Sequence, residues 1–285
     1  MSEYAKFGPG GNSEAFYDAG FKSSSDAPAW LKSIGLDAYE YQAGNGLTAG
    51  PKALTAIGEA AKAAGIQMSI HAPYFISLSG VIPEKRLGSI RYIRDSLSAG
   101  ELLGAYLAVV HTGSAAKISR REAVELAKDT LSNLLTEVSD NGILIGLETM
   151  GKINQLGTLD EVIELCTLSP RLVPVVDFGH MNARECGGVF PDADAYRRVF
   201  NRIGETLGDS VARNLHCHFS RIEWTSGGEK KHLTFSDETY GPDHEPLMEA
   251  IAKERLTPTI ICESAGTMSD DALTMKLCYE RMLQS

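Results

Sequence analysis

The chain has 285 residues, of which 43% are hydrophobic and 22% are charged. This balance excludes an intrinsically disordered protein and allows one large hydrophobic core. The 27 basic and 37 acidic side chains give a formal net charge of −10, which argues against a protein that coats nucleic acid through its bulk charge but is compatible with a local basic strip.

Eight short apolar runs alternate with longer amphipathic segments along the chain. Most of the runs are rich in Val, Ile and Leu without strict alternation, which is typical of parallel strands that are buried on both faces. We therefore predict strands at 5–7, 38–41, 67–71, 106–111, 143–148, 173–177, 214–218 and 258–263.

The segments between these runs have helical periodicity. Ser119 and Glu122 form a capping-box pattern at the start of a helix that runs to about Ser139, and Thr158 and Glu161 form a second one before a helix that ends ahead of Pro170. The other predicted helices span 53–64, 87–103, 192–207, 245–253 and 270–283.

Eight strands that are each followed by helical material predict an α/β fold, a single (β/α)8 TIM barrel domain that covers residues 1–285. An open doubly wound sheet is the alternative, and it requires a glycine-rich phosphate turn after an early strand. The segment Gly8-Pro-Gly-Gly11 is rich in glycine but lacks the GxGxxG order. We interpret the polar stretch 221–242 as an extended loop after the seventh strand.

The amino-terminal residues, the apolar runs and the cysteines together predict a cytoplasmic protein. Residues 1–11 show no signal-peptide pattern, and no apolar run approaches the roughly 18 residues that cross a membrane. The five cysteines are odd in number, scattered and without CxxC spacing, so we expect reduced thiols. They are Cys166, Cys186, Cys217, Cys262 and Cys278.

Six consecutive predicted strands each finish in His, Asp or Glu, while their interiors are apolar. The carboxyl ends of parallel barrel strands meet at one mouth, where active sites are built. Imidazole and carboxylate groups without thiolates favour zinc, manganese or iron in a partly open catalytic site. The candidate ligands are His71, His111, Glu148, Asp177, His180, His216, His232 and Glu263.

The number of candidate ligands predicts more than one metal. A catalytic zinc ion usually takes three protein ligands and a water molecule. Eight candidates therefore imply two or three metals with a bridging carboxylate. Each histidine taken alone is more often a hydrogen-bonded structural residue, so the prediction rests on the coincidence across six strands.

An ordered set of motifs resembles the endonuclease IV family of apurinic/apyrimidinic endonucleases, within the superfamily of xylose isomerase-like TIM barrels. The set covers about residues 35–264. The motifs are Ser69-Ile-His71-Ala-Pro-Tyr74, Val110-His111-Thr-Gly113, Leu147-Glu148-Thr, Asp177-Phe-Gly-His180, Leu215-His216-Cys-His-Phe-Ser220 and Cys262-Glu263.

The resemblance implies a trinuclear zinc site and a role for each ligand. It implies that His71 and His111 hold the first metal and that Glu148 bridges the first and second. It assigns the second metal to Asp177, His216 and Glu263, and the third to His180 and His232. Glu263 and Glu148 are the implied catalytic carboxylates, and Glu263 also orients the attacking hydroxide.

The sequence departs from the family pattern after the seventh strand. Lys230 stands where the family has the Asp of its third-metal motif, and Glu229 is one residue away. His218 and Phe219 replace a family Asn-Asp pair. We therefore treat His218 and Glu229 as possible additional ligands or as hydrogen-bond partners of the ligands.

The candidate substrate-binding residues lie near the same mouth. Tyr74 and Phe75 match the family loop that enters the DNA stack at the lesion, and capping of the barrel rim is the alternative. The basic side chains Arg184, Lys230 and Lys231 are candidates for phosphate contacts, and ordinary surface charge is the alternative.

The sequence is compatible with three functions. The first is a zinc-dependent hydrolase that cleaves DNA on the 5′ side of abasic sites in base excision repair. The second is a divalent-metal sugar or sugar-phosphate isomerase or epimerase, in which one metal on Glu148, Asp177, His216 and Glu263 polarises the substrate. The third is a non-enzymatic metal-binding or interaction protein descended from such an enzyme. We favour the first, with two or three Zn2+ ions (Mn2+ or Fe as alternatives), and expect a monomer without membrane contact.

Overall fold

A computed structural model describes residues 4–284 and shows eight parallel strands that close into a barrel. The barrel strands are β1 (Lys6–Pro9), β2 (Ala38–Gln42), β3 (Gln67–His71), β4 (Ala105–His111), β5 (Leu144–Glu148), β6 (Leu172–Asp177), β7 (His216–Phe219) and β10 (Thr259–Cys262). Their order is β1-β10-β7-β6-β5-β4-β3-β2. Backbone hydrogen bonds from Asp37 N to Phe7 O and from Gly11 N to Glu40 O, both 2.9 Å long, join β1 to β2.

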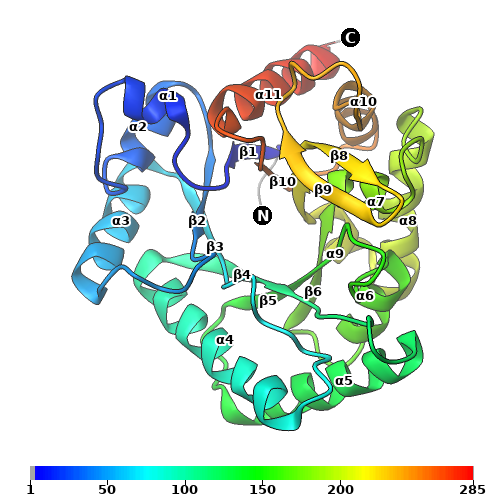
Figure 1. Cartoon of the computed structure of the whole chain (residues 1–285). Coiled ribbons are helices and arrows are strands. Elements are labelled where there is room, and N and C mark those ends of the chain that lie inside the picture. The colour runs from blue at the N-terminus through cyan, green and yellow to red at the C-terminus, as the bar shows by residue number, and fades with distance from the viewer. Residues whose placement is uncertain (1–3, 285) are drawn as a thin grey trace.

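Helices surround the strands on the outside (Figure 1). They are α1 (Glu14–Asp18), α2 (Ala27–Ser33), α3 (Pro51–Ala64), α4 (Pro83–Leu103), α5 (Arg120–Glu137), α6 (Leu159–Cys166), α7 (Phe178–Arg184), α8 (Ala193–Leu207), α9 (Asp209–Arg213), α10 (Glu245–Lys253) and α11 (Met268–Gln284). Both predicted capping boxes are present, since Ser119 and Thr158 each accept the backbone N–H three residues ahead. The short helices α1, α2, α7 and α9 were not predicted.

The predicted TIM barrel is confirmed, and the glycine-rich segment has a role in its closure. Gly8 lies on β1 where β2 passes close by, and a Cβ atom there would lie 1.8 Å from the carbonyl oxygen of Ala38. Only glycine allows these two strands to approach and close the barrel. The segment therefore serves strand packing and is not a phosphate turn.

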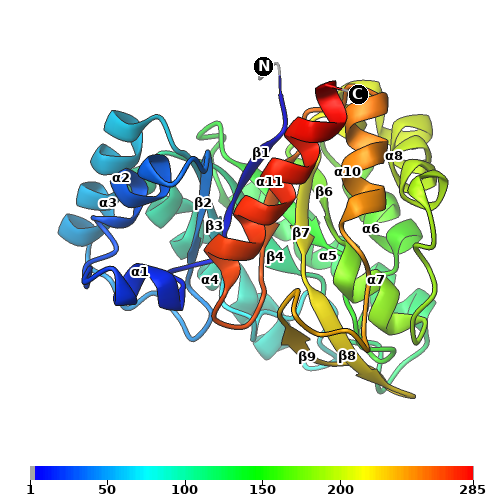
Figure 2. The same ribbon diagram turned by 90° about the horizontal axis from the view of Figure 1, so that it is seen from above.

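The stretch 221–242 is not simply an extended loop, so that prediction was wrong in its first half. It contains an antiparallel hairpin of β8 (Arg221–Thr225) and β9 (Gly228–Leu233). Ile222 is buried while its neighbours are partly exposed, and Gly228 adopts a φ of 88° directly after the turn. Figure 2 shows the hairpin at the end of the barrel opposite to the two termini.

The remaining expectations concern cysteines and membranes. All five cysteines are free, and four of them are buried. Within residues 4–284, no helix combines the length and the apolar character that a membrane crossing requires.

Candidate metal centre at the carboxyl end of the barrel

A cavity of about 450 Å3 opens at the carboxyl end of the barrel strands. The ends of β2, β3, β4, β5 and β10 contribute to its wall together with α7 and the hairpin. The parallel direction of the strands brings these ends together. Its polar lining comprises Gln42, His71, His111, Glu148, Lys152, Gln155, His180, Glu229, His232 and Glu263.

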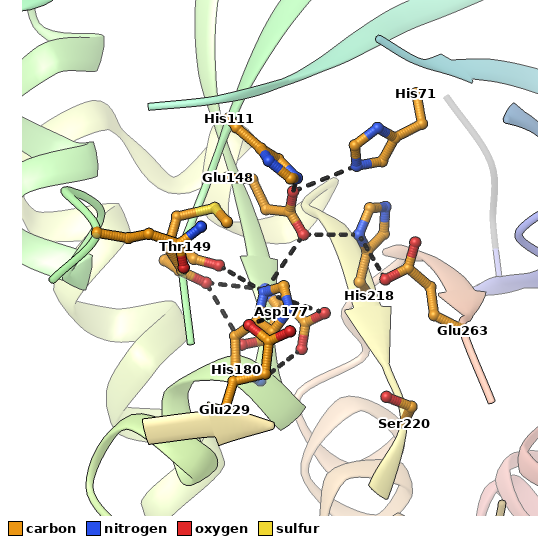
Figure 3. Close-up of polar contacts among 12 residues, drawn as sticks. His71, His111, Glu148, Thr149, Asp177, His180, His218, Ser220, Glu229 and Glu263 are labelled. Atoms are coloured by element: carbon orange, nitrogen blue, oxygen red, sulfur yellow. Dashed lines mark hydrogen bonds and ion pairs between the residues drawn. The ribbon is translucent and has the colours of Figure 1, made fainter. Parts of the chain in front are cut away.

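Glu148, the last residue of β5, lies at the centre of this lining and is fully buried. Its Oε2 atom lies 3.3 Å from Nε2 of His71 and 3.1 Å from Nε2 of His111. Its Oε1 atom lies 3.0 Å from Nδ1 of His218 (Figure 3). The carboxylate therefore faces imidazoles on two sides.

Glu148 also belongs to a second group of donors, together with Asp177, His218 and Glu263. One donor atom from each of these residues lies within 4.8 Å of the others. Asp177 Oδ1 accepts the backbone N–H of His180 at 2.7 Å and so caps α7. Asp177 Oδ2 is buried and accepts no hydrogen bond from the described residues. A buried carboxylate oxygen without a donor is costly unless a cation binds it.

A third group combines His180 with Glu229 and His232 of the hairpin. Nε2 of His180 lies 3.5 Å from Glu229 Oε2, and Nε2 of His232 lies 4.0 Å from Glu229 Oε1. The backbone N–H of Glu229 donates to the carbonyl of Gly151 at 3.0 Å, which attaches the hairpin to the loop after β5. A Cβ atom on Gly151 would lie 2.7 Å from Cβ of Glu229, so glycine is needed at this contact.

Three of the imidazoles use one nitrogen for a hydrogen bond and direct the other at a carboxylate. Nδ1 of His71 donates to the Ala72 carbonyl at 2.8 Å, and Nδ1 of His180 donates to the Thr149 carbonyl at 3.0 Å. Nδ1 of His232 lies 2.9 Å from the Ser220 hydroxyl. A carbonyl can only accept, so Nδ1 of His71 and His180 carries a proton, and Nε2, on the side of the carboxylates, is the nitrogen that could bind a metal once it loses its proton. Metal-binding histidines are oriented in this way.

The electrostatics of the cavity indicate a shortage of positive charge. Burial opposes the imidazolium of His71, but the hydrogen bond and charge of Glu148 outweigh burial and raise the pKa of His71 to about 9. Burial likewise opposes the charged form of His180, but Asp177 and Glu229 raise its pKa to about 9. Burial and the charge of Glu263 raise the pKa of Asp177 despite the neighbouring His180. Divalent cations would supply the missing charge, and this donor set of imidazoles and carboxylates suits them.

Comparison with known families agrees with this geometry. Residues 28–276 match the model of a family described as the xylose isomerase-like TIM barrel. The chain belongs to the xylose isomerase-like TIM barrel family. The resemblance predicted from the motifs is thereby confirmed at the level of the family.

Two curated relatives illustrate the range of this family. An uncharacterized protein of Methanocaldococcus jannaschii is 30% identical over 219 residues, which is 76% of this chain and 78% of the relative. A probable endonuclease 4 of Mycoplasma genitalium is 29% identical over 206 residues, which is 70% of this chain and 67% of the relative.

Solved structures with the same fold include enzymes of two kinds. A D-tagatose 3-epimerase-like protein has a TM-score of 0.64 and 21% identity, over 87% of this chain and 89% of that protein. Endonuclease IV from Thermus thermophilus has a TM-score of 0.64 and 18% identity, over 92% of this chain and 94% of that protein. At these identities the structures establish the fold of the xylose isomerase-like barrel and not the reaction.

The two histidines of β7 occupy different depths in this barrel. His218 pairs with Asp177 in the strand register, whereas His216 pairs with Val175, two residues deeper. His218 joins the group of Glu148, Asp177 and Glu263, at the position that the sequence resemblance assigned to His216. Burial lowers the pKa of His216 despite its contact with Glu40.

Glu40 of β2 was missed by the sequence reasoning. It is fully buried, and its Oε2 and Oε1 atoms lie 3.0 Å from Nε2 of His216 and 3.1 Å from Nε2 of His218. The signal that could have found it is a carboxylate in the middle of the apolar run 38–41, because an unpaired buried charge is costly.

The candidate substrate-binding residues have different surroundings. Tyr74 and Phe75 are 55% and 47% exposed at the barrel rim, and Tyr74 lines the cavity. Arg184 donates to the carbonyls of Met150, Lys152 and Ile153, and therefore holds the loop after β5. Lys230 and Lys231 both pair with Glu223 on the hairpin, at 2.5 and 3.4 Å.

Proposed function

We propose that this protein is a metal-dependent phosphodiesterase that cleaves DNA on the 5′ side of abasic sites, with two or three zinc ions. The observation that supports this proposal is that the cavity holds several overlapping groups of donors, three of which together contain nine residues, and two of these three share Glu148. Closely spaced metals suit the displacement of one phosphate oxygen by another. An isomerase that acts with one metal has less use for His71, His111, His180 and His232.

The residues of the chain have distinct roles in this reaction. Metals bound here would polarise the phosphate and make hydroxide available near neutral pH. Glu148 is buried and held by imidazoles, so it fixes the positions of its neighbours. The Glu263 side chain is 16% exposed and faces the cavity, so it can orient the nucleophile against the phosphorus. The exposed rings of Tyr74 and Phe75 are placed to fill the gap left by a missing base.

A sugar epimerase or isomerase is the second candidate, and the state of the basic residues favours it. Arg184, Lys230 and Lys231 are engaged with carbonyls or with Glu223, which leaves them less able to neutralise phosphates. A cavity of about 450 Å3 also has room for a monosaccharide. The epimerase-like fold neighbours are compatible with this candidate.

One experiment separates the two candidates. The purified protein, loaded with zinc, is incubated with a 5′-labelled duplex that contains a single abasic-site analogue, with the intact duplex as a control, and with free ketohexoses in a parallel assay. We expect cleavage at the abasic site that disappears after chelation and returns with zinc. Interconversion of ketohexoses without cleavage, together with one metal per chain, would establish the second candidate instead.

A further inference from the structure

A chain of polar side chains lies below the metal centre, inside the barrel. It begins at Tyr106 on β4, continues through His216 on β7 and Glu40 on β2, and reaches His218, a member of the second donor group. The interior of a TIM barrel is usually filled by branched apolar residues. Buried polar groups in this place need a specific reason, because an unpaired one would cost free energy.

Donor atoms of Glu40, His216 and His218 also lie within 4.8 Å of one another, but the hydrogen bonds of Glu40 distinguish it from the three donor groups described above. Its Oε2 atom accepts from the Ser69 hydroxyl at 2.9 Å and from Nε2 of His216 at 3.0 Å. Its Oε1 atom accepts from the Gln42 amide at 3.2 Å and faces Nε2 of His218 at 3.1 Å. Three hydrogen-bond donors therefore occupy the carboxylate of Glu40, in contrast to Asp177, whose Oδ2 atom accepts no hydrogen bond from the described residues. Glu40 is therefore a hydrogen-bond acceptor for imidazoles.

The carboxylate of Glu40 determines which nitrogen of each neighbouring imidazole carries a proton. A carboxylate only accepts, so Nε2 of His216 carries its proton toward Glu40, and Nδ1 of His216 accepts from the Tyr106 hydroxyl at 2.6 Å. Nε2 of His218 lies 3.1 Å from Oε1 of Glu40 and has no other hydrogen-bond partner among the described residues, so the negative charge of Glu40 favours a proton on this nitrogen. Nδ1 of His218 is hydrogen-bonded to Oε1 of Glu148 at 3.0 Å on the side of the metal centre, so a metal that binds this nitrogen would replace the proton there.

We propose that Glu40 is a positioning residue, held in place by Tyr106 through His216, that fixes His218 with Nδ1 toward the metal shared by Glu148, Asp177, His218 and Glu263. This inference rests on the proposed metal centre. Carboxylate partners of this kind set the tautomer of a metal-binding histidine, and their loss weakens metal binding by about ten- to a hundredfold. The effect is selective, because His71, His180 and His232 take their orienting contacts from other groups.

The test uses E40Q, Y106F and Y39F in the full-length protein. Tyr39 neighbours Glu40 on β2 and donates its hydroxyl proton to Asn12 at 2.8 Å. Y39F therefore removes one comparable hydrogen bond that does not belong to the row of polar side chains from Tyr106 to His218. Zinc stoichiometry and stepwise dissociation constants are measured by competition with a chromophoric chelator. The visible spectrum of the cobalt-substituted protein reports the geometry of the second group.

In E40Q, we expect the dissociation constant of one metal equivalent to rise ten- to a hundredfold, and the cobalt spectrum to change. In Y106F, the dissociation constant of the same equivalent should rise by a smaller factor. The other equivalents and Y39F should match the wild type. Equal weakening of all equivalents, or no change in either variant while the wild type binds metal, overturns the inference and leaves the metal centre standing. A wild type that binds no metal overturns the proposed centre itself. Should E40Q fail to fold, Y106F decides, because it loses only a hydroxyl.

Discussion

Nε2 of His180 lies 3.5 Å from Oε2 of Glu229, although one residue belongs to α7 and the other to the hairpin that crosses the end of the barrel. The hairpin reaches this place through the hydrogen bond from Glu229 N to Gly151 O. A carboxylate thus stands beside His180 and His232 even though the family position for it holds Lys230.

Replacement of Glu229 by Gln should remove one metal equivalent. The third donor group would keep only His180 and His232 as strong ligands, and a neutral amide binds zinc poorly compared with a carboxylate. Metal analysis after dialysis against a dilute chelator measures the change. Lys230→Gln is the matched control, because Lys230 contacts Glu223 and lies outside the donor group. A full metal content in Glu229→Gln would show that Glu229 holds no metal.

Replacement of Glu263 by Gln should lower the rate of abasic-DNA cleavage by at least about a hundredfold, as expected for the loss of a charged group that holds metal and nucleophile. The fold should persist, because Glu263 is partly exposed and the amide keeps its volume. Single-turnover cleavage and thermal unfolding are measured on the same preparation. Wild-type cleavage by this variant would exclude Glu263 from the reaction.

Replacement of Gly151 by Ala should displace the hairpin and weaken the third group. The added methyl would lie 2.7 Å from Cβ of Glu229 and 3.0 Å from Cδ2 of His180, and such overpacking costs about 1–3 kcal/mol. The free energy of unfolding from chemical denaturation and the metal content should both decrease. The control is Gly88→Ala, an exposed site in α4 with open space around the new methyl, which should stabilise the protein by about 0.5–1 kcal/mol. Unaltered stability and metal content in Gly151→Ala would contradict the close contact.

The barrel could be predicted from the sequence because its signal is local. Apolar runs such as 143–148 and 106–111 have no polar face, and a run of this kind forms a strand covered on both sides. The hairpin could not be predicted in the same way, because its only fully buried apolar residue is Ile222 and its pairing depends on the Gly151 loop.

The position of the site residues along the barrel axis could not be predicted, because it depends on the register between neighbouring strands. His216 and His218 lie on the same face of β7, since side chains two apart on a strand point the same way. Which of them meets Asp177 depends on how far β7 extends beside β6, and the register pairs Asp177 with His218. Glu40 was missed for a related reason, since its partners come from β7 and from Ser69 on β3.

Metal binding should become stronger as the pH rises toward 9. In the metal-free protein, Glu148 raises the pKa of His71 and Asp177 raises that of His180, each from 6.5 to about 9 and against the opposing effect of burial. These raised values stabilise the metal-free fold fully below pH 6.5, and this stabilisation is lost as the pH rises through 9. A metal must displace the same protons, so its affinity increases over that interval. Melting temperatures of dialysed metal-free and zinc-loaded protein should therefore diverge between about pH 6 and pH 8.5. A difference that stays constant or narrows would mean that metal does not displace the protons of these imidazoles, and His71→Gln should reduce the divergence if it does.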